Sequence, residues 1–258
     1  MSMEDEVSKQ ATAAVGDLMG KVYEDVARPS ARQVGTSLET LFRVGLSPIS
    51  MLSWGFDRSK EWLEALIERK IQSTPPENLI SPSVSIAIST ISAISASVDN
   101  PELRSLYAEL LLKSIDSRTQ ELVHPSYIGV IGQLSPQEAL IFVSFRENGT
   151  KSIFEAEYND YSYVGDPTIE SLFFKHCSSL IPCNEQQCEL WFENLLRLRL
   201  LVIQSYAEAE YVEPYEYDQR PRVKNSERKH VYTTEYGRGL LRACEPSQSG
   251  GEPTFSQI

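Results

Sequence analysis

The stretch QLSPQEALIF, residues 133–142, decides how the fold is divided, because it carries the signals of a helix start in the middle of the chain. Ser135 and Glu138, three residues apart, match a capping box, in which each side chain accepts a hydrogen bond from a free backbone N–H of the first turn. Pro136 then takes the first helical position, where its missing N–H removes no hydrogen bond. The stretch therefore predicts a helix that begins a second structural unit, and its serine and glutamate require no catalytic role.

A second capping box, formed by Asn184 and Gln187, predicts another helix further along the chain. Two short runs rich in aliphatic, aromatic or β-branched residues follow at 200–205 and 230–234, so we expect a hairpin with a long tip. Helix, loop, helix, hairpin and a closing TTEYGRGLL segment together resemble a winged helix. We therefore expect residues 133–245 to form a winged-helix-like α+β domain, followed by a flexible tail over residues 246–258.

The sequence before Gln133 predicts helices only. Apolar residues recur at helical spacing in four segments, 7–26, 62–71, 84–98 and 103–115. Residues 81–98 carry no charge, but they are rich in serine and have a single apolar stripe, which favours a buried helix over a membrane span. We expect residues 1–132 to form a helical bundle, so the fold class of the whole chain is mainly α.

Charge and cysteine content limit the classes of partner. The formal net charge is −12, and acidic residues exceed basic ones on both sides of Gln133, so neither half is suited to binding polyanions. The helix before the hairpin would expose Glu185, Glu189 and Glu193 where a DNA-binding winged helix meets phosphates, which argues against DNA binding. Four cysteines, no apolar signal-peptide core and no long uncharged apolar segment predict a cytoplasmic protein.

The expected hairpin tip separates charges by sign. The acidic residues on its outgoing side are Glu208, Glu210, Glu213, Glu216 and Asp218. The basic residues on its return side are Arg220, Arg222, Lys224, Arg228 and Lys229. Opposed across a ribbon, the two sets would pair with each other; the alternative is that the basic set forms an arm that binds a protein partner.

Several stretches in a distinctive order carry a resemblance to a known family. They are VARPSARQVG, PPENLISPS, SVDNPELRSLYAELLLKSID, VHPSYIGVIGQLSPQEALIF, ENLLRLRLL and VYTTEYGRGLLRAC. Over about residues 20–245 the chain resembles the abortive-infection alpha (Abi-alpha) family of bacterial proteins. The resemblance implies an accessory or effector role in defence against phage, and it supplies no established catalytic residues. We expect action through a protein partner or self-association, without catalysis, cofactor or small-molecule substrate.

A ribonuclease is the first alternative. Arg118 and His124 are separated by five residues, which fits the arginine-to-histidine spacing of the HEPN ribonucleases. Such a pair could activate a ribose hydroxyl and stabilise the developing phosphorane charge. Pro125, directly after the histidine, differs from a helix-embedded catalytic histidine. The competing interpretation is that His124 has a capping or packing role.

A membrane-perturbing effector is the second alternative, with residues 37–56 lying at the inner membrane. The uncharged stretch 44–56 contains four large apolar residues that could enter a bilayer, namely Met51, Leu52, Trp54 and Phe56. The acidic surroundings disfavour unaided binding to anionic lipid. Burial of these residues in the core is the competing interpretation.

A cluster of histidine and cysteine residues is the remaining candidate for a metal site. His176, Cys177, Cys183 and Cys188 lie close together in the sequence, but their spacing lacks the paired C-x-x-C of zinc knuckles. We expect the cysteines to act as small buried apolar residues and predict no metal.

Overall fold

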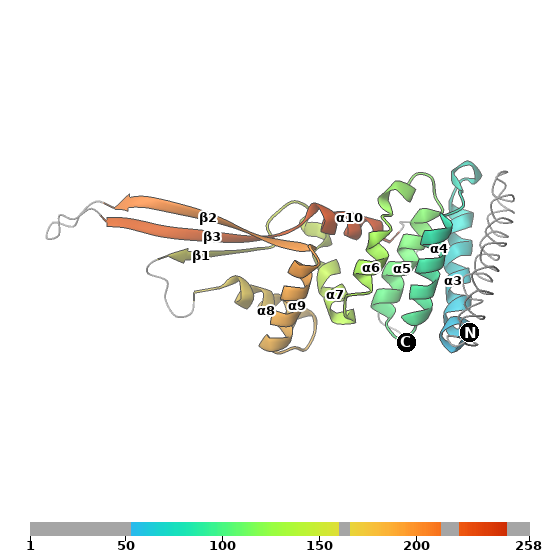
Figure 1. Ribbon diagram of the computed structural model, residues 1–258, viewed down its shortest axis with the longest axis horizontal. Coiled ribbons are helices and arrows are strands. Elements are labelled where there is room, and N and C mark those ends of the chain that lie inside the picture. Colours follow the sequence, from blue (N-terminus) through green and yellow to red (C-terminus); the bar gives the residue numbers. More distant parts are fainter. Residues whose placement is uncertain (1–52, 160–165, 213–221, 247–258) are drawn as a thin grey trace, which may run out of the picture. The chain divides into compact units, whose positions relative to one another are not determined.

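The computed structural model describes residues 53–159, 166–212 and 222–246, which belong to two compact units (Figure 1). The boundaries between the units fall after Pro136 and after Arg242, so the first unit takes up the chain again at Ala243. The described residues are mainly helical, with one small three-stranded antiparallel sheet. This confirms the prediction of a mainly α chain.

The regular elements in the described part of the first unit are all helices, with one isolated β-bridge between Leu79 and Asp116. Its elements are α3 (Ser53–Ser73), η2 (Pro76–Asn78), α4 (Val84–Ala96), α5 (Pro101–Ser114), η3 (Gln120–Leu122) and α6 (Ser126–Ile131). Helices α3, α4 and α5 pack side by side (Figure 1). The side chains with at most 1% exposure between them include Leu63, Ile91, Ile94, Leu110 and Leu111. The apolar stripes of the sequence are therefore the core of this unit.

Helix α4 accounts for the uncharged stretch. Ala87, Thr90 and Ile94 are fully buried, and the hydroxyl of Ser95 donates to the carbonyl of Ile91 at 3.0 Å, so small polar residues are accommodated inside the helix layer. The helix begins at Val84, because the side chain of the N-cap residue Ser83 accepts the hydrogen bond from the N–H of Ile86. No helix in residues 53–159, 166–212 and 222–246 is long and apolar enough to cross a membrane.

The second unit alternates helices and strands. Its elements are α7 (Pro136–Ser144), η4 (Arg146–Asn148), β1 (Phe154–Asn159), α8 (Ile169–Leu180), α9 (Glu185–Arg197), β2 (Leu201–Val212), β3 (Arg222–Thr233) and α10 (Glu235–Ala243). The strand order is β1-β3-β2, all antiparallel. Helices α8 and α9 pack against the sheet and against each other.

Local capping signals place the helix starts of this unit. The side chains of Asn184 and Gln187 form the predicted reciprocal cap of α9, and α7 begins at Pro136 as expected. Glu138 does more than the sequence indicated, because it is 5% exposed and accepts a hydrogen bond from the Asn194 amide at 2.8 Å. That bond joins α7 to α9, although the two residues are far apart in sequence.

The hairpin differs from the sequence prediction. The predicted hairpin is present, but its strands are longer than the expected runs 200–205 and 230–234, since β2 extends to Val212 and β3 begins at Arg222. Charged residues continue both strands because each backbone is paired across the ribbon in an unbroken antiparallel register. Strand β1 and helix α8 were not predicted at all.

Candidate functional site

One face of the sheet carries polar and aromatic side chains at its surface. Val231 and Thr233 are almost completely buried, so their neighbours His230 and Tyr232 project from the opposite side of β3. The register brings Gln204 of β2 and Glu155 of β1 beside His230. We call this face the outer face; its residues are Glu155, Glu157, Gln204, Tyr206, Arg228, His230 and Tyr232.

Three aromatic rings adjoin one another on the outer face. The His230 ring lies edge to face with Tyr206 at 5.3 Å between centroids and is stacked with Tyr232 at 6.0 Å. The Tyr206 hydroxyl donates to Oε1 of Gln204 at 2.7 Å, and Tyr206 remains 48% exposed. Burial, together with the nearby Tyr206, raises the pKa of Tyr232. Exposed aromatic groups of this kind are enriched in protein interfaces.

The charged residues of the outer face form loose pairs. Nε of Arg228 lies 3.7 Å from Oε2 of Glu157, and Nδ1 of His230 lies 3.3 Å from Oε1 of Glu155 without the geometry of a hydrogen bond. All four side chains are at least partly exposed. Such pairs contribute little to stability, so they can exchange partners at small cost.

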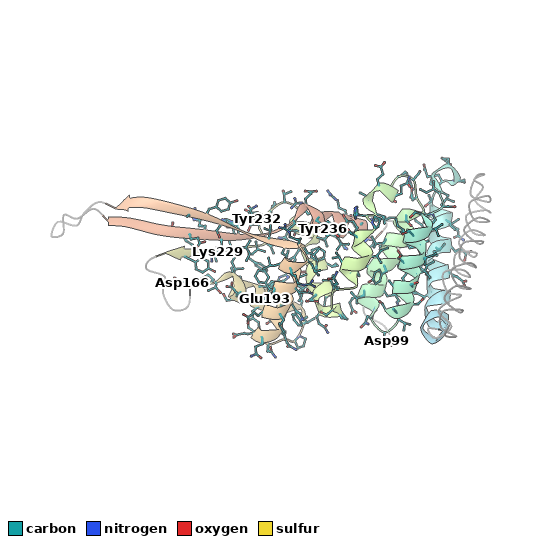
Figure 2. The ribbon with its side chains drawn as sticks, viewed as in Figure 1. Asp99, Asp166, Glu193, Lys229, Tyr232 and Tyr236 are labelled. Atoms are coloured by element: carbon teal, nitrogen blue, oxygen red, sulfur yellow. The ribbon has the colours of Figure 1, made fainter. Side chains whose placement is uncertain are left out.

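The five basic residues predicted to bind a partner have different surroundings. Arg228 belongs to the outer face, whereas Lys229 lies on the other side of β3 (both Lys229 and Tyr232 are labelled in Figure 2), with its ammonium group 4.6 Å from the centroid of the Tyr158 ring. Lys224 lies opposite Glu210 in the register, but the side chains of Arg222 and Lys224 are outside the described part. Arg220 lies outside the described residues altogether.

A pocket of about 730 Å³ opens beside the outer face, at the start of the hairpin. Its lining includes Gln204 and Tyr232 of the outer face, together with Arg199, Glu235 and Arg238. The guanidinium of Arg238 pairs with Glu235 at 2.6 Å, whereas Arg199 is exposed and its backbone has a φ of 59°. Thr233 also belongs to the lining, and its buried hydroxyl has no hydrogen-bond partner among the described residues. The pocket thus offers polar groups next to the aromatic cluster.

Close backbone packing holds the wall of this pocket. Thr234 caps α10 by accepting the N–H of Gly237 at 2.8 Å, and its hydroxyl donates to the carbonyl of Arg199. A Cβ on Gly237 would collide with the carbonyl oxygen of Leu200, so no larger residue fits there without a backbone shift. The start of α10 and the turn before β2 are therefore fixed to each other.

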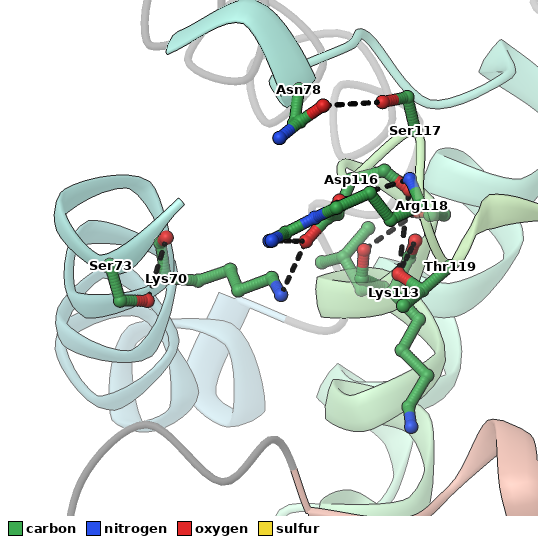
Figure 3. Close-up of polar contacts among 10 residues, drawn as sticks. Lys70, Ser73, Asn78, Lys113, Asp116, Ser117, Arg118 and Thr119 are labelled. Carbon is green, nitrogen blue, oxygen red and sulfur yellow. Dashed lines mark hydrogen bonds and ion pairs between the residues drawn. The ribbon is translucent and has the colours of Figure 1, made fainter. Parts of the chain in front are cut away.

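Arg118, the first of the two ribonuclease candidates, is engaged in an ion cluster (Figure 3). Its Nε and one terminal nitrogen donate to the two carboxylate oxygens of Asp116 at 2.9 and 2.8 Å, and Nζ of Lys70 donates to the same carboxylate at 2.9 Å. Asp116 is 0% exposed. Hydrogen bonds from Arg118, and then those from Lys70, hold the pKa of Asp116 well below its ordinary value despite burial. This cluster joins α3 to the segment that follows α5.

His124, the second candidate, makes local contacts only. Its Nδ1 lies 2.6 Å from the Ser126 hydroxyl and accepts the Ser126 N–H at 3.2 Å, at the start of α6. In the described part of the chain no hydrogen bond or ion pair joins His124 to Arg118. The pair is therefore not assembled as a reacting unit by any such contact.

The other candidates are placed as follows. Met51 and Leu52 lie outside the described residues, and Trp54 and Phe56 belong to α3 with side chains that are also outside them. Among the described residues, no group of three or more His, Cys, Asp or Glu side chains could hold a metal ion. His176 packs on Phe145 at 5.0 Å between ring centroids and hydrogen-bonds the Ser144 hydroxyl at 2.8 Å.

Comparison with known proteins supplies one match. A family model described as abortive infection alpha matches residues 55–244, which include nearly all of both described units. Neither a curated protein nor a solved structure shows significant similarity to the chain.

Proposed function

Because the chain belongs to the abortive infection alpha family, and membership of that family indicates a role in phage defence, we propose that it acts there by binding a protein partner through its outer face. The observation that carries this proposal is the partly exposed aromatic cluster of Tyr206, His230 and Tyr232 beside an open pocket. Large aromatic side chains bind partners with little loss of side-chain entropy, and they dominate the energetics of protein interfaces.

The position of β2 supports the same surface. With strand order β1-β3-β2, β2 lies at an edge, and half of its backbone N–H and C=O groups face away from β3. The pocket is lined by residues 201–204 of this strand. A partner segment could therefore add backbone hydrogen bonds to β2 while its side chains contact the outer face and the pocket.

The element order also supports a protein partner over DNA. Helix, strand, two helices, two strands and a closing helix follow one another as in a winged helix, with α9 in the position of the helix that reads DNA. Glu185, Glu189 and Glu193 of α9 are all exposed, and the exposed side of this helix also presents Leu190, which is 66% exposed. Carboxylates at helical spacing would repel a phosphate backbone. We take the domain to be a protein-interaction winged helix acting in the bacterial cytoplasm.

The proposal is tested by phage challenge of cells that produce the protein. Tyr206→Ala combined with Tyr232→Ala should weaken protection, because it removes two of the three rings. We expect the plating efficiency of the phage on these cells to rise at least tenfold above its value on cells with the wild-type protein. Tyr206→Phe is the matched control, because it keeps the ring and loses only the hydroxyl bond to Gln204. Equal amounts of folded protein are verified by thermal denaturation. Full protection by the double alanine variant would show that the outer face is not the functional surface.

The partner is identified at the same site. A photo-crosslinking amino acid at position 206 should yield a defined adduct during infection, and the same group at Glu170, on the exposed surface of α8, should not. Light scattering then gives the molar mass of the purified chain. A dimer would indicate that the partner is a second copy of this chain, and a monomer that the partner is another protein.

A further inference from the structure

Two cysteine side chains are brought together at the start of α9. Cys183 directly precedes the N-cap Asn184, and Cys188 is the fourth residue of the helix. Residues in these two positions contact each other in a hydrophobic staple, which fixes how the chain enters a helix. Here the contact is between two thiols, whose sulfur atoms are 3.2 Å apart.

We propose that Cys183 and Cys188 form an oxidation site, which hydrogen peroxide converts into an intramolecular disulfide. A disulfide has an S–S length of about 2.05 Å, so the two sulfur atoms must approach by about 1 Å from their present separation. The segment that must adjust is the short link between α8 and α9, residues 181–184, in which Cys183 is partly exposed.

Hydrogen peroxide is the only oxidant that this reaction requires. The Cys183 thiol loses its proton, and the thiolate attacks one oxygen of hydrogen peroxide. The O–O bond breaks, a sulfenic acid forms, and the leaving hydroxide takes up the released proton to become one water. The sulfur of Cys188 then attacks the sulfenic sulfur, the S–O bond breaks and the S–S bond forms, while the proton of the Cys188 thiol goes to the leaving hydroxide, which departs as a second water. The two thiols lose two electrons and two protons, and peroxide is reduced to two waters.

Burial explains why Cys183 reacts first. The other three cysteines have side chains that are almost completely buried: Cys177 at 0%, Cys188 at 2% and Cys244 at 3% exposure. Burial raises the pKa of Cys188 to about 11 and also raises the pKa of Cys177, so both persist as thiols that peroxide attacks slowly. Cys188 is thus the resolving thiol, which acts because it is already in contact with Cys183.

The test uses the purified full chain, reduced, treated with hydrogen peroxide and then alkylated. Cleavage by trypsin after Lys175 and Arg197 leaves all three neighbouring cysteines in one peptide, and cleavage after Glu185 and Glu189 separates Cys183 from Cys188. We expect peptides 176–185 and 186–189 to remain joined until reduction, with Cys177 and Cys244 alkylated. Cys177→Ala should give the same joined pair.

Two results would overturn the proposal. One is that wild-type protein treated with peroxide has Cys183 and Cys188 both alkylated or over-oxidised, with no joined peptides. The other is that Cys183→Ser still yields joined peptides, because Cys177 would then be the partner of Cys188. The wild-type measurement requires no variant to fold, and circular dichroism of Cys183→Ser verifies that its helices are intact.

Discussion

Replacing Asp116 by asparagine should destabilise the first unit strongly, because it removes the charge at the centre of the ion cluster while keeping the shape of the side chain. The carboxylate is fully buried and accepts from Lys70, whose own side chain is only 9% exposed. Breaking a buried pair by neutralising one partner costs about 3–5 kcal/mol, since the other charge stays buried without compensation. The asparagine oxygen can still accept one hydrogen bond, so we expect a loss near the lower end, about 3 kcal/mol.

Urea denaturation followed by circular dichroism measures this loss as a fall in the midpoint without a change in slope. The control is Glu121→Gln, which neutralises an exposed carboxylate in η3 and should change the free energy of unfolding by less than about 0.5 kcal/mol. The lowered pKa of Asp116 also fixes the sign of the pH effect. The stabilisation is complete above the ordinary carboxylate pKa of about 4 and is lost as the pH falls towards the folded value. A midpoint equal to that of the control variant would refute the reasoning.

Three further predictions concern other parts of the chain. Gly237→Ala should lower the free energy of unfolding by about 2 kcal/mol or more in thermal denaturation, because its Cβ would collide with the Leu200 carbonyl; an unchanged melting temperature would contradict this. His176 has a pKa lowered by burial, so its neutral form is favoured in the fold and stability should decrease as the pH falls below about 6.5. His176→Phe should remove that part of the pH dependence, and persistence of the full slope would exclude His176 as its source. His124→Ala should leave phage protection and cellular RNA patterns as in the wild type, whereas loss of protection together with altered RNA would favour the ribonuclease alternative.

The helix starts could be predicted because their signals are local. Pro136 and the Asn184 cap act on backbone groups within one turn, so sequence spacing alone identifies them. The burial of α4 could be predicted equally well, since its serine content and single apolar stripe distinguish it from a membrane span. Glu138 shows the limit, because its partner Asn194 is reached only through the tertiary fold.

The sheet could not be predicted in the same way. Strand β1 and the outer halves of β2 and β3 are held by partners in distant parts of the chain, and charged residues in them weaken the alternating pattern. The outer face joins residues from three strands, so Tyr206, His230 and Tyr232 were not recognised as a group. The ion pair of Arg118 does have a signal in the sequence: Asp116 stands two residues before it, and a carboxylate so near is a natural ion-pair partner.

The division of the chain has a consequence for its synthesis. The first unit leaves the chain at Pro136 and resumes at Ala243, and the resumed segment includes Ala243 and Cys244, both buried. During translation, residues 137–242 leave the ribosomal exit tunnel before Ala243 and Cys244 do. Domains fold largely as units, in the order in which they are completed. The core of the first unit can therefore be completed only after the whole second unit has been translated.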